Sequence, residues 1–271
     1  NKEDRIGSMF VNPGGPGASG VEYAYQAEYI VSPQLLALFD IVGFDPRGVG
    51  RSAPIRCLTD DETDANYASD SKPDNPAEFE TLVKEAQEYV AKCEKNTKNL
   101  TAYSTENAAR DMDIIRAVLG DEKLNYLGKS YGTYLGTIYA QLFPDKVGRV
   151  VLDGAIDPGA TPLQQSLIQA VGFDNALDAF IKDCLQLDIC PLPKDATPQY
   201  FTDLFDSVAK KPLITSTKRV ATESLVVLGT ASALYDNESG WPMLRVALKQ
   251  AKTGNGYMFL SLADAYTGRQ F

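Results

Sequence analysis

Gly128-Lys129-Ser130-Tyr131-Gly132 is the stretch of sequence that decides the fold. It has the pattern G-x-S-x-G and stands between an apolar, strand-like segment at residues 123–127 and a helical pattern over residues 131–143. In that context the pentapeptide predicts a nucleophile elbow, a tight turn that holds the serine in a strained backbone conformation. It also places Ser130 at a helix N-terminus, where free N–H groups favour developing negative charge. The alternative is a glycine-rich turn with an incidental serine.

A second glycine-rich stretch, Asn-Pro-Gly-Gly-Pro-Gly at residues 12–17, directly follows an apolar segment at residues 6–12. A nucleophilic serine needs a second backbone donor for the oxyanion, and a glycine-rich loop after an earlier strand can supply it. The loop lacks the glycine spacing of nucleotide-binding loops. Because the two stretches occur in the order that a serine hydrolase requires, each strengthens the interpretation of the other.

Further along the chain, strand-like apolar runs at residues 39–44 and 147–152 alternate with helical patterns, which predicts an α/β fold with a mostly parallel sheet. Helices are expected from residue 76, ending near Cys93, and over residues 104–119 and 131–143. Residues 54–75 are polar and indicate a loop. From about residue 158 only helical patterns continue, with the expected helices at 164–187, 199–210, 222–235, 242–253 and 258–266. We therefore expect two domains, a core at 1–156 with an excursion at 54–100, and a helical lid at 157–271.

Four segments together resemble the secreted tripeptidyl aminopeptidases of the α/β-hydrolase fold, which are relatives of the prolyl aminopeptidases. They are residues 12–17, 43–52 (Gly-Phe-Asp-Pro-Arg-Gly-Val-Gly-Arg-Ser), 128–136 and 151–154. The resemblance runs from about residue 7 to the end and is most specific over the first 155 residues. It implies an α/β-hydrolase core with an inserted helical lid.

The resemblance also implies roles for individual residues. Ser130 would be the nucleophile, and the backbone N–H groups of Tyr131 and Gly15 would form the oxyanion hole, with Gly14 the less expected neighbour. The implied partner is a peptide substrate with a free N-terminus, from which short peptides, such as tripeptides, or single residues are released. Such a mechanism needs no metal and no organic cofactor.

The 271 residues include no histidine, so they cannot contain a complete Ser-His-Asp triad or a histidine metal site. The resemblance places the triad acid and histidine after the lid, beyond Phe271, and two further strands ahead of the first glycine-rich loop. We therefore expect a chain truncated at both ends, whose missing C-terminal segment completes the triad. Hydrolysis by these residues alone should be negligible.

Other charged residues compete for catalytic roles. Asp153 follows a strand and is an alternative triad acid, although Asp-Gly at a strand end is equally a turn signal. Lys129 is disfavoured as a base, because side chains of neighbouring residues on a tight turn diverge. Structural hydrogen bonds or a salt bridge, shaping the neighbouring glycine-rich loop, are expected for Asp45 and Arg47. An ion pair is expected for two neighbouring residues of the helix before the elbow, Arg110 and Asp111.

Binding the free α-amino group calls for carboxylates at the closed end of the substrate pocket. The acids of the expected lid are candidates by location alone, so no substrate-binding residue is assigned; they are Asp174, Asp178, Glu223, Asp236 and Glu238. Two other functions remain open. One is a secreted esterase or lipase of the same fold, and the other is a non-catalytic binding protein on this scaffold.

Composition narrows the class of partner. The chain has 26 Lys and Arg against 36 Asp and Glu, a net charge of −10, which argues against nucleic acid or an anionic membrane surface. No stretch approaches the roughly 18 apolar residues of a membrane helix, and none has the pattern of a signal peptide.

The four cysteines, Cys57, Cys93, Cys184 and Cys190, include no CxxC pair, which makes a metal site improbable. Two disulfides are the favoured interpretation and would place the protein in an oxidising, secreted or extracellular compartment. Three connectivities are possible, and proximity in sequence favours Cys57 with Cys93 and Cys184 with Cys190. Four buried free thiols in a cytosolic protein are the alternative.

Overall fold

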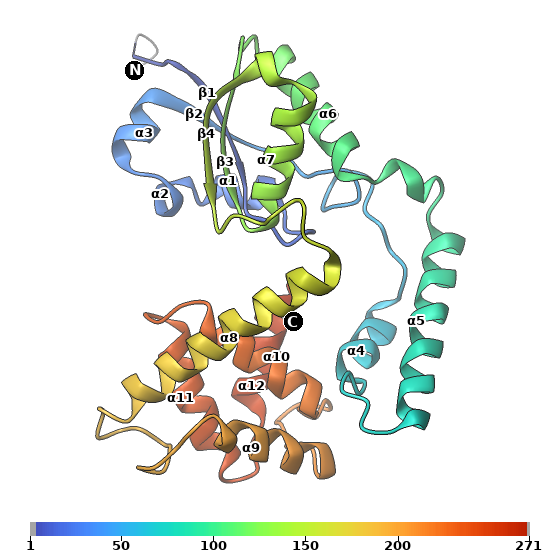
Figure 1. Cartoon of the computed structure of the whole chain (residues 1–271), viewed down its shortest axis with the longest axis vertical. Coiled ribbons are helices and arrows are strands. Elements are labelled where there is room, and N and C mark those ends of the chain that lie inside the picture. Colours follow the sequence, from blue (N-terminus) through green and yellow to red (C-terminus); the bar gives the residue numbers. More distant parts are fainter. Residues whose placement is uncertain (1–3, 270–271) are drawn as a thin grey trace. The chain divides into compact units, whose positions relative to one another are not determined.

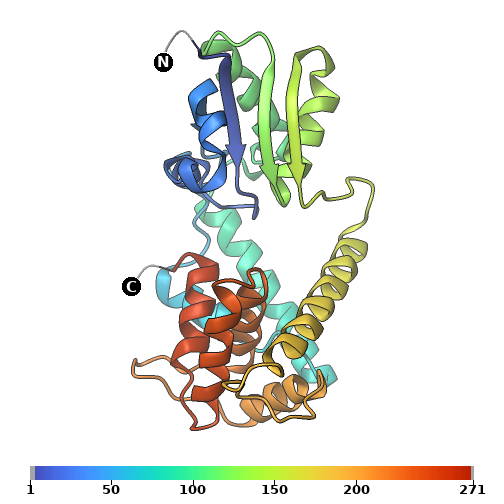
Figure 2. The same cartoon turned by 90° about the vertical axis from the view of Figure 1, so that its left-hand side faces the viewer.

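A computed structural model describes residues 4–269 of the chain (Figures 1 and 2). The described strands are β1 (Gly7–Asn12), β2 (Phe39–Gly43), β3 (Leu124–Lys129) and β4 (Val147–Asp153). The described helices are α1 (Gly20–Tyr25), α2 (Ala27–Ile30), α3 (Pro33–Leu38), α4 (Asp60–Ala68), α5 (Pro76–Asn96), α6 (Thr105–Val118), α7 (Tyr131–Leu142), α8 (Pro162–Cys184), α9 (Gln199–Lys210), α10 (Glu223–Leu234), α11 (Gly240–Ala251) and α12 (Tyr257–Thr267). Short 3₁₀ turns, Leu100–Ala102 and Pro144–Lys146, precede α6 and β4.

The four strands form one sheet in the order β2-β1-β3-β4, and every neighbouring pair is parallel. Figure 2 shows β1, β3 and β4 side by side. In β1, Phe10 lies opposite Val42 of β2 and Tyr126 of β3. The parallel α/β sheet predicted from the alternation of apolar runs and helical patterns is confirmed. Since parallel strands end at the same edge of a sheet, the segments after β1, β3 and β4 meet there.

Helices cover both faces of this sheet, as a parallel sheet requires. On one face Phe10 and Tyr126 are buried against α6 and α7, where Met112 and Leu135 are fully enclosed. On the other face Met9 packs with residues of α2, α3 and β2. Successive residues of β1 thus point to opposite faces, so its apolar run is continuous rather than alternating.

The chain divides into two compact units. One unit contains the chain up to Cys57 together with Val90–Gln165, and includes the whole sheet. The other contains Leu58–Tyr89 and the chain from Ser166 on. The sequence-based division at 156/157 assigned residues 54–100 to the core as an excursion, whereas in the structure most of that segment groups with the later helices.

Helix α4 lies within residues 54–75, where the sequence analysis expected only loop, and this expectation was wrong. Thr59 and Glu62 form a capping box, in which each side chain accepts a hydrogen bond from the other's backbone N–H. Three acidic residues in the first turn complement the helix dipole. The helix has no fully buried residue and no apolar face, so hydrophobic periodicity could not reveal it.

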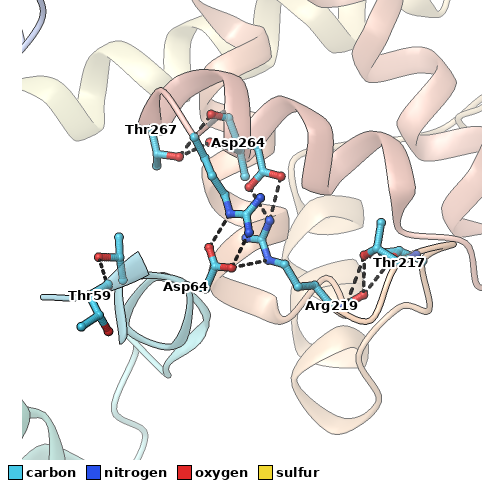
Figure 3. A network of polar contacts seen from close by, with 10 residues as sticks. Thr59, Asp64, Thr217, Arg219, Asp264 and Thr267 are labelled. Carbon is cyan, nitrogen blue, oxygen red and sulfur yellow. Dashed lines mark hydrogen bonds and ion pairs between the residues drawn. The ribbon is translucent and has the colours of Figure 1, made fainter. Parts of the chain in front are cut away.

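A network of charged side chains joins α4 to the end of the chain (Figure 3). Arg269 donates two hydrogen bonds to the carboxylate of Asp64, at 2.5 and 2.6 Å. Arg219 lies 3.5 Å from Asp64 and donates to both oxygens of Asp264, each at 2.8 Å. Hydrogen bonding by Arg269 lowers the pKa of Asp64 below its usual value. Asp64, separated by 205 residues from Arg269, is therefore an integral part of the helical unit.

Two disulfides are present, Cys57–Cys93 in the sheet unit and Cys184–Cys190 in the helical unit. These are the pairings favoured by proximity in sequence. Cys184 is fully buried at the end of α8, among the aromatic residues of the helical core. Among the described residues, no helix is both long enough and apolar enough to cross a membrane.

Candidate active site

Ser130 occupies the turn between β3 and α7, as the G-x-S-x-G pattern predicts. Its φ and ψ are 51° and −121°, a conformation that residues other than glycine seldom adopt. The backbone is held on both sides, because the Ser130 N–H donates to the Asp153 carbonyl (2.9 Å) and Thr133 donates twice to the Ser130 carbonyl (2.7 and 2.8 Å). The serine itself is exposed. The fold therefore holds this hydroxyl at the carboxyl edge of the sheet in a strained turn.

The glycines on either side of this turn are required by close packing. A Cβ on Gly132 would lie 2.9 Å from both the carbonyl and the side-chain oxygen of Asn12. A Cβ on Gly128 would lie 2.6 Å from the Gly132 carbonyl carbon and 2.5 Å from the ring of Tyr126. The Tyr126 hydroxyl also donates to the Gly132 carbonyl at 2.7 Å. Helix α7 thus starts so close to β1 and β3 that side chains at these two positions would clash.

The loop at residues 12–17, which we call the oxyanion loop, lies directly against the elbow. A Cβ on Gly14 would be 2.9 Å from Ser130 Cβ and 3.1 Å from the Tyr131 nitrogen. Gly14 and Gly15 have φ values of +97° and +110°, which favour glycine. The structure therefore places Gly14 of the oxyanion loop against Ser130 and Tyr131, with Gly15 the next residue along the loop.

Hydrogen bonding distinguishes the two adjacent glycines of this loop, Gly14 and Gly15. The Gly14 N–H donates to the side-chain oxygen of Asn12 at 2.9 Å. The Gly15 N–H has no partner within the described part of the chain, and neither has the N–H of Tyr131, the first residue of α7. The Gly17 N–H is likewise without a partner in the described part of the chain, so the loop offers Gly15 and Gly17 as unpaired donors and Gly14 as a paired one.

A buried carboxylate anchors the chain just after the oxyanion loop. Asp45, which is 6% exposed, accepts hydrogen bonds from the Ser19 hydroxyl (2.6 Å), the Val21 N–H (3.3 Å) and the Arg51 N–H (2.9 Å). Burial alone would raise the pKa of Asp45, but these three hydrogen bonds, that of Arg51 foremost, outweigh it and hold the pKa below its usual value. Asp45 thus fixes the N-terminus of α1, and its predicted structural role is confirmed.

Arg47 forms a second structural contact. It makes a bidentate ion pair with Asp111, with distances of 2.7 and 2.8 Å, and donates to the Ala102 carbonyl at 2.8 Å. Arg110 instead donates to Asn107 at 2.9 Å, so the expected pairing of Arg110 with Asp111 was wrong. Adjacent residues on a helix do not face each other, which leaves the Asp111 carboxylate free for a partner from another segment.

Asp153 and Lys129 flank the serine without contacting its hydroxyl. The Asp153 carboxylate lies 3.7 Å from the Lys129 ammonium, and both side chains are substantially exposed. No side chain among the described residues forms a hydrogen bond with Ser130 Oγ. The site therefore contains an exposed serine in a strained turn and unpaired backbone N–H groups, and the chain contains no histidine to act as base.

Sequence reasoning missed two residues that shape the site. Asn12 binds the Gly14 N–H two residues ahead, a local turn that an asparagine before Pro-Gly-Gly could have indicated. The Thr133 hydroxyl donates to the Ser130 carbonyl and accepts from the Ile156 N–H (2.9 Å), so it links the elbow to the segment after β4. Nothing in the local sequence marks that second contact.

Comparison with known proteins agrees with this geometry. Residues 7–231 match the alpha/beta hydrolase fold family. The chain belongs to the α/β-hydrolase family. It is 38% identical to the serine protease Hip1 of Mycobacterium tuberculosis over 98% of its length, which covers 53% of that relative. It is 43% identical to the tripeptidyl aminopeptidase of Streptomyces lividans over 64% of its length, covering 33% of that protein.

A third relative carries a different name. The carboxylesterase B of Mycobacterium tuberculosis is 41% identical over 98% of the chain, which covers 52% of that relative. The α/β-hydrolase chain spans about half the length of Hip1 and of this esterase. Fold and relatives together place the chain in the α/β-hydrolase family, among relatives named serine protease, tripeptidyl aminopeptidase and carboxylesterase B.

Proposed function

We propose that the full-length protein is a serine aminopeptidase that releases short peptides, such as tripeptides, or single residues from free N-termini. The observation that carries the proposal is the strained conformation of Ser130 beside two backbone donors that have no other partner, those of Gly15 and Tyr131. Support for a peptide substrate comes from relatives named tripeptidyl aminopeptidase and serine protease.

In the proposed mechanism, Ser130 Oγ attacks the scissile carbonyl carbon while a histidine takes the hydroxyl proton. The carbonyl oxygen gains negative charge and accepts hydrogen bonds from the Gly15 and Tyr131 N–H groups. The histidine then gives its proton to the leaving amine, the C–N bond breaks, and an acyl-enzyme remains. Water hydrolyses this ester by the same proton path, which regenerates the serine.

The acid and the histidine would come from a part of the protein outside these 271 residues, since the sequence contains no histidine. The outer edge of the sheet is a suitable place for that part to pack. β4 is the last strand in the order, and its Val151 and Leu152 are 59% and 36% exposed. We infer that further strands add to β4 and bring both triad members to the carboxyl edge, beside Ser130.

An ester-hydrolysing enzyme is the second candidate function, because the relative named carboxylesterase B matches almost the whole chain. Both enzymes would use the same nucleophile and oxyanion hole. They differ in the acyl group that they accept, so substrates distinguish them. A non-catalytic protein on this scaffold is the third outcome of the same test.

The test is to label the full-length protein with a fluorophosphonate and to compare its hydrolysis of a tripeptidyl chromogenic substrate, the same peptide with a blocked N-terminus, and a simple acyl ester. The aminopeptidase proposal predicts labelling at Ser130 and hydrolysis of the unblocked peptide. Ser130→Ala should abolish both, whereas Ser216→Ala, at an exposed position in the helical unit, should change neither. Labelling with ester hydrolysis alone supports the esterase, and absence of labelling refutes both enzymes.

We also propose that the protein is secreted. The two disulfides fit an oxidising compartment. Protein recovered from the culture medium should be alkylated without prior reduction and analysed by mass spectrometry. None of the four cysteines should carry the alkyl group, because cysteines in disulfides do not react with the reagent. Alkylated cysteines, or protein confined to the cytosol, would contradict this proposal.

A further inference from the structure

A buried hydroxyl is hydrogen-bonded to the peptide group that carries one of the two proposed oxyanion donors. The Tyr131 N–H belongs to the same peptide group as the Ser130 carbonyl. That carbonyl accepts two hydrogen bonds, from the Thr133 hydroxyl at 2.7 Å and from the Thr133 N–H at 2.8 Å. Because the atoms of a peptide group are coplanar, the direction of the carbonyl also fixes the direction of the N–H. Thr133 therefore helps to determine where the Tyr131 N–H points.

The Thr133 hydroxyl is itself held by the segment that follows β4. The Ile156 N–H donates to the hydroxyl oxygen at 2.9 Å, while the hydroxyl proton is directed to the Ser130 carbonyl. Since the hydroxyl accepts from one segment and donates to another, the direction of its proton is set by both contacts. The hydrogen bonds thus run from Ile156 through Thr133 to the peptide group of Ser130, whose N–H side is free.

These hydrogen bonds strengthen the donor as well as orient it. A hydrogen bond to an amide carbonyl polarises the amide and makes its N–H a stronger donor, since hydrogen bonds in series reinforce one another. Thr133 is 1% exposed, so water is excluded from the place of its hydroxyl. The negative charge that develops on the substrate carbonyl would therefore meet an N–H that is oriented before the reaction begins.

We propose that Thr133 is a positioning residue for the oxyanion hole, whose hydroxyl orients and polarises the peptide group that presents the Tyr131 N–H. This inference rests on the proposed function, since that N–H is one of the two donors of the proposed mechanism. Thr133 touches neither the substrate nor the reacting atoms. Its effect belongs to the transition state, in which the oxyanion forms, and leaves substrate binding unchanged.

The experiment compares variants of the full-length protein, with kcat and KM on the tripeptidyl substrate and the rate constant of fluorophosphonate labelling as readouts. Thr133→Val removes the hydroxyl and keeps the shape of the side chain. Loss of a whole oxyanion donor lowers kcat by about 10²–10³; here the donor remains but is less well oriented, so kcat and the labelling rate should fall by about tenfold. KM should stay within about twofold of wild type. Thr133→Ser keeps the hydroxyl and should restore most of the rate.

Thr137→Val is the matched control, one turn further along α7. The half-buried Thr137 donates its hydroxyl to the Thr133 carbonyl at 2.9 Å, the usual contact of a helical threonine with the residue four positions earlier. That carbonyl is not part of the peptide group of the proposed donor, so kcat should stay within about twofold of wild type. Equal rates in Thr133→Val and Thr137→Val would overturn the proposal. A Thr133→Ser variant as slow as Thr133→Val would also overturn it, since a retained hydroxyl should preserve the rate.

A transition-state analogue separates positioning from a general loss of structure. A tripeptide boronic acid forms a tetrahedral adduct with a nucleophilic serine, and one of its oxygens takes the place of the oxyanion. Its inhibition constant should rise by about tenfold in Thr133→Val, in parallel with the fall in kcat. An unchanged inhibition constant together with a lowered kcat would contradict the role of Thr133.

The two proposals fail in different ways. Wild-type protein that is not labelled at Ser130 refutes the proposed function, whatever the variants do. Wild-type protein that is labelled, with Thr133→Val labelled equally fast, refutes the role of Thr133 alone. If Thr133→Val does not fold, Thr133→Cys carries the test, because a thiol is a weaker donor than a hydroxyl. An unchanged kcat in that variant contradicts the proposal.

Discussion

Replacing Gly14 by alanine tests the close contact between the oxyanion loop and the elbow. The new Cβ would lie 2.5 Å from the Lys129 carbonyl oxygen, 2.9 Å from Ser130 Cβ and 3.1 Å from the Tyr131 nitrogen. Ordinary van der Waals contact needs about 3.5 Å, so the loop must retreat by roughly 0.5–1 Å. The positive φ of +97° adds strain of about 1–2 kcal/mol.

Gly17 provides the matched control in the same loop. Its φ is +115°, but a Cβ at this position would meet no atom within 4 Å. Gly17→Ala therefore carries a comparable backbone strain without the clash. We expect it to lower the stability of the full-length protein by about 1–2 kcal/mol and to leave kcat within about threefold of wild type.

Gly14→Ala should lower kcat by about 100-fold, the loss typical of a displacement of about 1 Å in a catalytic group. Its destabilisation should be about 2–5 kcal/mol, because overpacking adds to strain. The assay is the rate of fluorophosphonate labelling and of tripeptide release, corrected for the folded fraction. If Gly14→Ala and Gly17→Ala have the same kcat, the close approach of the loop to the elbow has no catalytic importance and the reasoning is wrong.

Two further predictions concern charged groups. The pKa of Asp45 is lowered in the folded state, so its contribution to stability is present above its unfolded pKa and is lost as pH falls through the folded value. The difference in unfolding free energy between wild type and Asp45→Asn should therefore shrink as the pH falls below about 4, and a constant difference in urea titrations would contradict this. Arg219→Met leaves Asp264, which is 1% exposed, without the guanidinium nitrogen that donates to both of its oxygens, and should destabilise the helical unit by about 3–5 kcal/mol. Lys84→Met, which breaks an exposed pair at 3.8 Å, is the control and should cost under about 1 kcal/mol; equal effects in thermal or urea unfolding would refute the role of the network.

The sheet and the elbow could be predicted because their determinants are local. Strand β3 contains Leu124, Tyr126 and Leu127 directly before the elbow, and Gly128 and Gly132 mark a turn at which close packing leaves no room for a side chain. The four expected strands are present within a few residues of their predicted limits. In each case the residues that define the feature are neighbours in sequence, so their pattern is visible without coordinates.

The features that the sequence could not show depend on contacts between distant segments. Helix α4 has no apolar periodicity, and its link to Arg269 crosses 205 residues. Asp111 pairs with Arg47 rather than with its sequence neighbour Arg110. That pairing depends on where the segment after β2 places the Arg47 guanidinium. The resemblance implied Gly15 rather than Gly14 as donor, but the hydrogen bond from the Gly14 N–H to Asn12 is seen only in the coordinates.

Because Leu58–Tyr89 belongs to the helical unit, that unit is discontinuous in sequence, and the polypeptide passes between the two units at residues 57/58, 89/90 and 165/166. A fragment that starts at Ser166 would lack α4 and would leave the two guanidinium groups of Figure 3 without the Asp64 carboxylate. A chimera that takes its helical unit from a relative must therefore replace both segments, Leu58–Tyr89 and the chain from Ser166 on. The residues at positions 64 and 269 should accordingly covary among relatives, although Asp64 and Arg269 lie in different segments of the unit.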